Sequence, residues 1–298
     1  MNLCSSHRPT ERAQPWLGTL VSIRVEGLAE TKAHEAIDAA FAEIATVHQL
    51  MSFHDPASDV SRLNRHAARH PVEVHPRTYF VLEQAQRFSQ ASEGCFDISV
   101  GAELVKWKML PAPVKEPDPQ SGSWRDVELF PGSRVAFHRP LWIDLGGIAK
   151  GFAVDRATEC LAQFRPSRAV VNAGGDIRIL GREAEPIRLG APSSECNAPV
   201  LELADGSAAG SSASLTQRRR GGDLCGPHVD GARRSAVLVD RFVCVIAEQC
   251  ITADALTKVV MARGAQSTEV LRKFSASAYI KDPHRDWQCV GAEEAKIQ

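Results

Sequence analysis

The chain has 298 residues, of which 44% are hydrophobic and 24% are charged, and its formal net charge is −1. This length allows one large or two modest domains, and the composition is that of an ordinary globular protein. A net charge so close to zero gives no sign of binding to nucleic acid or to an anionic membrane. No apolar run approaches the ~20 residues that a membrane-spanning helix needs.

The N-terminal residues 1–15 are polar and include two prolines. They predict a flexible arm ahead of a single domain over residues 16–298. Because the start lacks the apolar core of a signal peptide, we expect a cytoplasmic protein, or a periplasmic one if the true start lies upstream. The eight cysteines contain no Cys-x-x-Cys pair, which favours reduced thiols and gives no zinc site.

The first hundred residues predict one strand and two long helices. Near-alternating apolar residues indicate a strand over residues 17–25. Apolar residues at helical spacing indicate amphipathic helices over residues 29–50 and 78–91. Between these helices, the stretch MSFHDPASDV contains an Asp-Pro turn signal followed by a short helix.

The stretch IDLGGIAKGFAVDRA, which begins at Ile143, predicts a strand end, a Gly-rich turn and a helix up to Gln163. Glycines let backbone approach a ligand closely, and a helix start offers free N–H groups that suit a phosphate. Lys150 adds a full positive charge there. The pattern is neither a P-loop nor a G-x-G-x-x-G fingerprint. A tight strand–helix connection with a surface Asp144 and Lys150 explains the same residues equally well.

The second half of the chain predicts mostly strands. The AGGD sequence suits a tight hairpin between strands at residues 169–172 and 177–180. Residues 204–235 are predicted to be irregular, and Thr252 is predicted to cap a helix over residues 253–262. Because strands and helices come in blocks, an α+β fold with a mostly antiparallel sheet is expected. Further strands are predicted at residues 187–189, 200–203, 236–239, 242–246 and 275–280.

Six stretches in order resemble the FAD:protein FMN transferase family, the ApbE-type flavin transferases, and together they span nearly the whole chain. The resemblance implies a T-fold-like architecture with flanking helices, and binding of FAD and Mg²⁺. It also implies transfer of FMN to a threonine hydroxyl of an acceptor protein, with release of AMP. The stretches are LGTLVSIRV, MSFHDPASDVSRLNRHA, FDISVGAELVKW, IDLGGIAKGFAVDRA, VVNAGGDIRILG and ITADALTKVVMARG.

The resemblance also implies site residues. Magnesium would be held by the backbone carbonyl of Gly147 and by Asp254 and Thr257, and oxygen ligands of these kinds suit Mg²⁺. A hydroxyl nucleophile needs a base, and His228 is implied as a catalytic residue together with Asp254. A solvent-exposed loop histidine explains His228 equally well. The pyrophosphate of FAD needs neutralising charge, which Mg²⁺ and a lysine can supply. The implied cofactor contacts are Leu17, His54, Cys95, Phe96, Asp97, Asp144, Lys150 and Val229.

Several positions depart from the family pattern. The tyrosine of the family's MSxY stretch is His54 here, and the Asp-Pro-x-Thr-Gly after the histidine is reduced to Asp230-Gly231-Ala232-Arg233. The family's threonine four residues after the metal-binding aspartate is replaced by Lys258. Since Asp254 and Lys258 lie one helical turn apart, they can pair. The pair is either an ordinary exposed ion pair or places a positive charge beside Asp254 that competes with Mg²⁺. We therefore expect weaker Mg²⁺ dependence than in a typical family member.

Two alternatives stay open beside FMN transfer. In the first, water replaces the protein hydroxyl, and the protein is an FAD pyrophosphatase that yields AMP and FMN. In the second, the altered loop and Lys258 leave a non-catalytic flavin-binding or partner-binding protein. In each case FAD is expected to be preferred over FMN. The sequence names neither the acceptor protein nor the oligomeric state.

Overall fold

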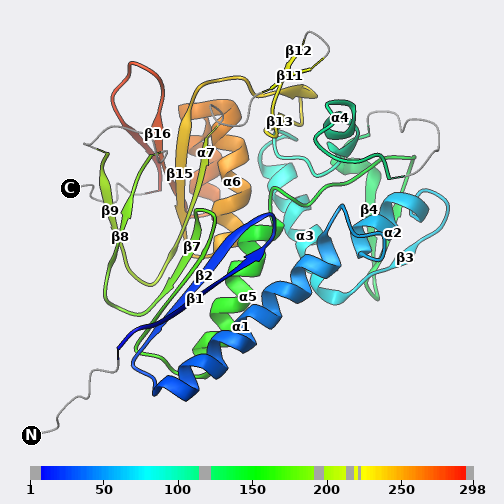
Figure 1. The fold of residues 1–298 in the computed structure, drawn as a ribbon. Coiled ribbons are helices and arrows are strands. Elements are labelled where there is room, and N and C mark those ends of the chain that lie inside the picture. Colours follow the sequence, from blue (N-terminus) through cyan, green and yellow to red (C-terminus); the bar gives the residue numbers. More distant parts are fainter. Residues whose placement is uncertain (1–7, 114–121, 191–197, 213–217, 221–222, 293–298) are drawn as a thin grey trace, which may run out of the picture.

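The computed structural model describes residues 8–113, 122–190, 198–212, 218–220 and 223–292. Its centre is an eight-stranded sheet whose order is β1-β2-β6-β7-β10-β15-β16-β17, and every pair of neighbours is antiparallel (Figure 1). The strands are β1 Thr10–Trp16, β2 Thr19–Glu26, β6 Arg168–Ala173, β7 Asp176–Leu180, β10 Ser207–Ser212, β15 Phe242–Ala247, β16 Ser277–Lys281 and β17 Gln288–Gly291.

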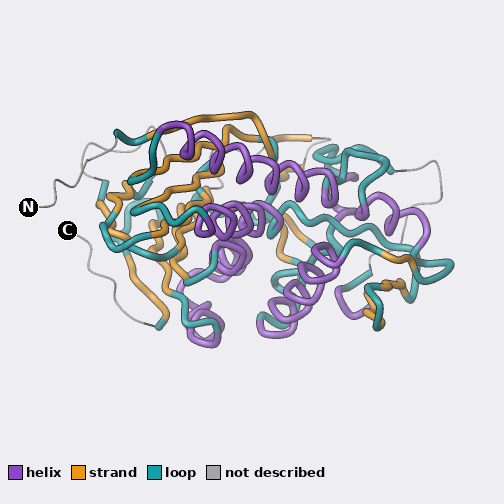
Figure 2. Tube along the Cα trace, turned by 90° about the horizontal axis from the view of Figure 1, so that it is seen from below, coloured by secondary structure: helices purple, strands orange, loops and turns teal. Residues whose placement is uncertain are grey.

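Helices pack against this sheet. α1 (Glu30–Met51) contacts β1, β2 and α5 (Ala149–Gln163), which in turn contacts β6, β7 and α6 (Cys250–Arg263). Figure 2 shows these helices grouped beside the strands. The main core lies between the eight-stranded sheet and these helices. Val21, Ile23 and Val25 of β2 are buried there, and the apolar faces of the three helices cover them. The short 3₁₀ helix Gly264–Ser267 and α7 (Thr268–Lys273) follow α6.

A second, smaller core is built around the hairpin of β8 (Glu185–Arg188) and β9 (Val200–Leu203). Leu189 and Leu201 pack there on Ala208, Cys244 and Tyr279, which come from β10, β15 and β16. Since side chains alternate along a strand, these strands bury residues on both faces of the sheet.

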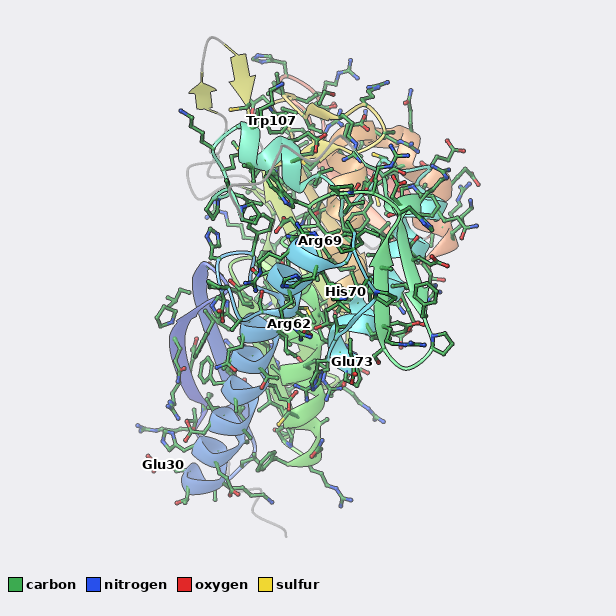
Figure 3. The ribbon with its side chains drawn as sticks, turned by 90° about the vertical axis from the view of Figure 1, so that its right-hand side faces the viewer. Glu30, Arg62, Arg69, His70, Glu73 and Trp107 are labelled. Carbon is green, nitrogen blue, oxygen red and sulfur yellow. The ribbon has the colours of Figure 1, made fainter. Side chains whose placement is uncertain are left out.

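The remaining elements form a smaller lobe, which lies at the right of Figure 1. Arg62 joins α2 to β3 by donating to the Asp59 carboxylate (2.9 Å) and to the carbonyl of Glu73 (2.8 Å) (Figure 3). The elements are α2 Asp59–His66, β3 Val72–Glu73, α3 Pro76–Ala91, α4 Gly101–Lys106, the 3₁₀ helix Trp124–Asp126, β4 Val127–Phe130 and β5 Arg134–Phe137, with the hairpins β11 Arg218–Arg220 and β12 Asp223–Cys225, and β13 Val229–Asp230 and β14 Ser235–Ala236.

The expected α+β class with a mostly antiparallel sheet is confirmed. Two segment predictions are wrong in part. The predicted arm 1–15 is ordered strand from Thr10, paired along its length with β2, while residues 1–7 lie outside the described part of the chain. The segment 204–235 was predicted as irregular, yet it contains β10, which lies in the middle of the sheet between β7 and β15. The sequence SAAGSS has none of the β-branched residues that mark strands.

The helix predicted to begin at a Thr252 cap begins instead at Cys250. Its cap comes from another helix: the Asp155 carboxylate of α5 accepts hydrogen bonds from the N–H groups of Cys250 (2.9 Å) and Ile251 (2.8 Å). A carboxylate there satisfies free donors and the positive end of the helix dipole. In return, the Gly151 N–H of α5 donates to the Asp254 carboxylate of α6 (3.0 Å).

Gly151 is required by this junction rather than by a turn. A β-carbon at this position would lie 2.3 Å from the carbonyl oxygen of Cys250. We expect Gly151→Ala to lower the free energy of unfolding by about 1–3 kcal/mol, because the helices must move apart. Gly210→Ala in β10 is the control, since its nearest neighbour would lie at 3.9 Å. Urea denaturation of both variants is the measurement, and equal stabilities would contradict the prediction.

Candidate functional site

Two adjoining cavities open where the N-terminal end of α5 meets the smaller lobe. One has a volume of about 310 Å³ and the other about 270 Å³. They share Leu110, Asp144, Gly146 and Lys150 in their walls. Two cavities joined at a charged boundary suit a ligand with two halves and a charged linkage between them.

The structure brings the predicted cofactor residues to these cavities. Leu17 and His54 line the smaller one, and Asp144 and Lys150 line both. The larger cavity is lined by Cys95, Phe96, Asp97 and Val229, and also by Gly147 and His228. Asp254 and Thr257 are fully buried in α6 next to Lys258, which itself lines the larger cavity.

Asp144 stands at the boundary because the smaller lobe fixes the chain before it. The side-chain amide of Asn64 in α2 bonds to both the N–H (2.8 Å) and the carbonyl (3.0 Å) of Ile143. The N–H of Asp144 donates to the carbonyl of Ile98 (2.8 Å). Burial raises the pKa of Asp144, against the opposing effects of the Gly146 N–H and of the His54 and Lys258 side chains.

Lys150 has a partner that the sequence reasoning did not name. Its ammonium forms an ion pair with Asp176, the first residue of β7. Burial opposes the charge on Lys150, but the carboxylates of Asp254 and Asp176 outweigh burial and raise the pKa of the lysine. Burial and the nearby Asp254 raise the pKa of Asp176 to about 6. The only signal for Asp176 was its place after two glycines, where it was interpreted as part of a hairpin turn.

His228 lines the larger cavity together with Lys258 and Ser211. Its backbone is fixed by the β13–β14 hairpin, where the Val237 N–H donates to the His228 carbonyl (2.8 Å). Burial lowers the pKa of His228 to about 4, and the Lys258 ammonium acts in the same direction. The ring is therefore neutral near pH 7, so one of its nitrogens carries a free lone pair.

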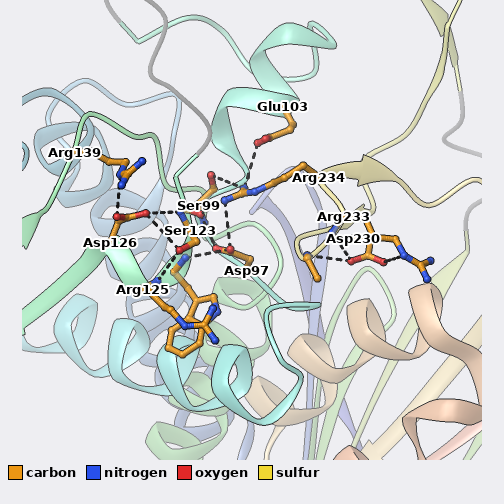
Figure 4. A network of polar contacts seen from close by, with 12 residues as sticks. Asp97, Ser99, Glu103, Ser123, Arg125, Asp126, Arg139, Asp230, Arg233 and Arg234 are labelled. Atoms are coloured by element: carbon orange, nitrogen blue, oxygen red, sulfur yellow. Dashed lines mark hydrogen bonds and ion pairs between the residues drawn. The ribbon is translucent and has the colours of Figure 1, made fainter.

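Arg234 clamps the segment that carries His228 onto the opposite wall (Figure 4). Its guanidinium donates to the Ser99 hydroxyl (2.8 Å) and carbonyl (3.1 Å) and lies 3.5 Å from Asp97 and from Glu103. In the same region the Gly231 N–H donates to the Cys95 carbonyl (3.0 Å). Asp97 thus serves as a buried anchor of the cavity wall.

The residues predicted to hold magnesium surround an ammonium group. The Lys258 ammonium pairs with one oxygen of Asp254, and the Gly151 N–H bonds to the other. The Thr257 hydroxyl donates to the Asp254 carbonyl (2.7 Å) and accepts from Ser211 (3.2 Å). This arrangement does not fit a magnesium ion. The oxygens that would have to bind it, those of the Asp254 carboxylate and the Thr257 hydroxyl, already have hydrogen-bond or ion-pair partners within the chain. Within the described residues, no cluster of three His, Cys, Asp or Glu side chains could hold a metal.

Solved structures with this architecture include the ApbE protein from Thermotoga maritima, with a TM-score of 0.82 and 26% sequence identity. The match covers 94% of this chain and 96% of that one. The flavin transferase ApbE from Vibrio cholerae matches with a TM-score of 0.79 at 21% identity, over 95% and 96% of the two chains, which shows a shared fold. The molecule therefore has the fold of the ApbE flavin transferases.

The family model described as "ApbE family" matches residues 17–280, and the chain belongs to this family. Relatives called FAD:protein FMN transferase include those of Treponema pallidum (29% identity) and Haemophilus influenzae (30%). These alignments cover 61% and 52% of this chain, and the chain spans about half of each relative, 54% and 48%. The relative from Chlamydia trachomatis is 28% identical over 84% of this chain and 83% of its own length.

The Arg234 clamp is tested with two neighbouring arginines. Arg234→Ala leaves Asp97 buried without its cation, and we expect a loss of about 1–3 kcal/mol in the free energy of unfolding. Arg233→Ala is the control, because the Arg233 side chain is 79% exposed against 19% for Arg234, and its change should stay within about 0.5 kcal/mol. Urea denaturation measures both; equal losses would show that Arg234 does not anchor the wall.

The pKa of His228 predicts a pH dependence of stability. Its folded pKa, about 4, lies below its ordinary value of 6.5, so the unfolded chain binds more protons between these values. The free energy of unfolding should therefore fall as the pH drops from about 6.5 towards 4. His228→Gln removes this contribution, and its stability should fall less steeply over the same window. Thermal denaturation at several pH values compares the two, and parallel curves would contradict the lowered pKa.

Proposed function

We propose that this protein is an FAD:protein FMN transferase, which moves FMN from FAD to a threonine hydroxyl of an acceptor protein and releases AMP. Membership of the ApbE family and the printed names of its relatives support this proposal. The observation that carries it is the pair of cavities joined at Asp144 and Lys150, with the neutral His228 in the wall of one of them.

The proposed step breaks the phosphoanhydride bond of FAD and forms a phosphoester bond to threonine. The threonine oxygen attacks the FMN-side phosphorus of the pyrophosphate, and the bond from this phosphorus to the bridging oxygen breaks. AMP leaves with the electron pair of that bond, and the hydroxyl proton passes to a ring nitrogen of His228. Lys150 supplies positive charge beside the phosphates, and its Asp176 partner holds it in place.

The apolar wall of the larger cavity suits an aromatic ring. Phe96 lines it, while burial raises the pKa of the Cys95 thiol to about 11 and keeps this group uncharged. An acceptor threonine and the cytoplasmic location stay predictions from the sequence, whereas the predicted magnesium position at Asp254 is taken by the Lys258 ammonium. Because the donors around Asp254 are occupied, no part of the proposed step passes through a metal ion. Within the described part of the chain, no helix has the length and apolar character of a membrane span.

The proposal is tested by incubating the protein with FAD and a candidate flavin-acceptor domain. AMP is measured by chromatography and the flavinylated acceptor by its fluorescence in a denaturing gel. AMP together with a fluorescent band is the expected result. AMP without a band would assign FAD hydrolysis instead, and the absence of both would leave a binding protein.

In the same assay, His228→Ala should slow AMP release by about 10²–10⁴-fold, because the proton acceptor is lost. Binding of FAD, followed by quenching of flavin fluorescence, should be nearly unchanged. His138→Ala replaces an exposed histidine outside the cavities and serves as the control. Unchanged AMP release in His228→Ala would remove the histidine from the mechanism.

A further inference from the structure

The ammonium of Lys258 lies where the sequence predicted a magnesium ion. Its side chain is 19% exposed and forms an ion pair with Asp254, whose side chain is fully buried. The ammonium also donates to the backbone carbonyl of Asp254 at 3.1 Å. Because the other carboxylate oxygen accepts from Gly151, Asp254 has a donor for each oxygen within this chain. The negative charge of the Asp254 side chain is therefore already balanced within the chain.

The lysine side chain lies among the residues that could have held a divalent ion. A β-carbon added at Gly147 would lie 3.4 Å from Cε of Lys258, so the lysine stem passes directly beside that backbone. The hydroxyl of Thr257 is already shared between Ser211 and the Asp254 carbonyl. Any cation bound to Asp254 would have to displace the ammonium from this position.

Charge also opposes a second cation there. The Asp254 carboxylate is already paired with the Lys258 ammonium. A divalent ion bound to the same carboxylate would face this positive charge in a largely buried site, where like charges repel more strongly than in water.

The same ammonium can still serve an anion in the cavity. A lysine ammonium carries three N–H donors, and the contacts to Asp254 use two of them. Lys258 lines the larger cavity beside His228, and Lys150 lines both cavities. A phosphate in the larger cavity, close to its boundary with the smaller one, would therefore meet two lysines, each held by a buried carboxylate.

We propose that the ammonium of Lys258 takes the place of a divalent ion at Asp254 and contacts the phosphates of the bound dinucleotide, so that FAD binds without added metal. This inference rests on the proposed function, since it takes FAD as the ligand. Lys258 is thus assigned as a substrate-binding residue. Its presence removes the requirement for a metal ion.

The first test uses the unmodified protein. FAD is titrated in excess EDTA and in excess MgCl₂, and binding of Mn²⁺ is followed separately by electron paramagnetic resonance. We expect the same Kd for FAD in both buffers and no protein-bound Mn²⁺. A tighter Kd in magnesium, or stoichiometric Mn²⁺ binding, would overturn the role of Lys258 while leaving the proposed function intact. No FAD binding in either buffer would overturn both.

The second test changes the lysine. Lys258→Thr should weaken FAD binding in EDTA on the order of 10- to 100-fold, the loss of one hydrogen bond to a charged group. It should also create Mn²⁺ binding, and magnesium should then restore part of the affinity. Lys32→Thr, an exposed lysine of α1, is the matched control and should change neither. An unchanged Kd in EDTA for Lys258→Thr would contradict contact with the phosphates. If this variant does not fold, the titrations of the unmodified protein still decide the question.

Discussion

The junction between the first turns of α5 and α6 is the interaction on which the site depends. Each helix supplies a carboxylate that accepts backbone N–H groups of the other: Asp155 accepts from Cys250 and Ile251, and Asp254 accepts from Gly151. These are the N–H groups that a helix cannot satisfy within itself. The exchange fixes both helix starts at one point.

The consequence of this junction is a concentration of charge at the cavity. Lys150 lies in the first turn of α5, and Lys258 lies one turn after Asp254 in α6. Both ammonium groups are partly buried, and each is paired with a buried carboxylate, Asp176 or Asp254. Removing one partner of such a pair would leave an uncompensated charge in the interior, which is strongly unfavourable. Paired in this way, Lys150 gives positive charge to the boundary of the two cavities and Lys258 to the wall of the larger one, which also holds a histidine kept neutral by burial.

The role of His228 could be predicted from the sequence, but its position in the cavity could not. Its role was inferred from a resemblance, in a stretch where most of the surrounding motif is altered. The structure places it in the cavity because β13 and β14 pair and because Arg234 fastens the hairpin to Ser99, Asp97 and Glu103. No local pattern indicated this clamp, since a guanidinium that bonds residues more than 130 positions away has no signature in its own neighbourhood.

The sequence by itself determined the α+β class, the long helices and the six stretches that identify the family, because periodic burial and glycine turns leave local patterns. It also indicated that Asp254 and Lys258 could pair, since one helical turn separates them. Only the tertiary structure showed that this pair is buried, that Asp176 is the partner of Lys150, and that Asp155 rather than Thr252 caps α6. It also revealed β10, whose small residues have little strand propensity and become a strand through pairing with β7 and β15. These features depend on groups brought together from distant parts of the chain, and their energies arise only when water is excluded around them.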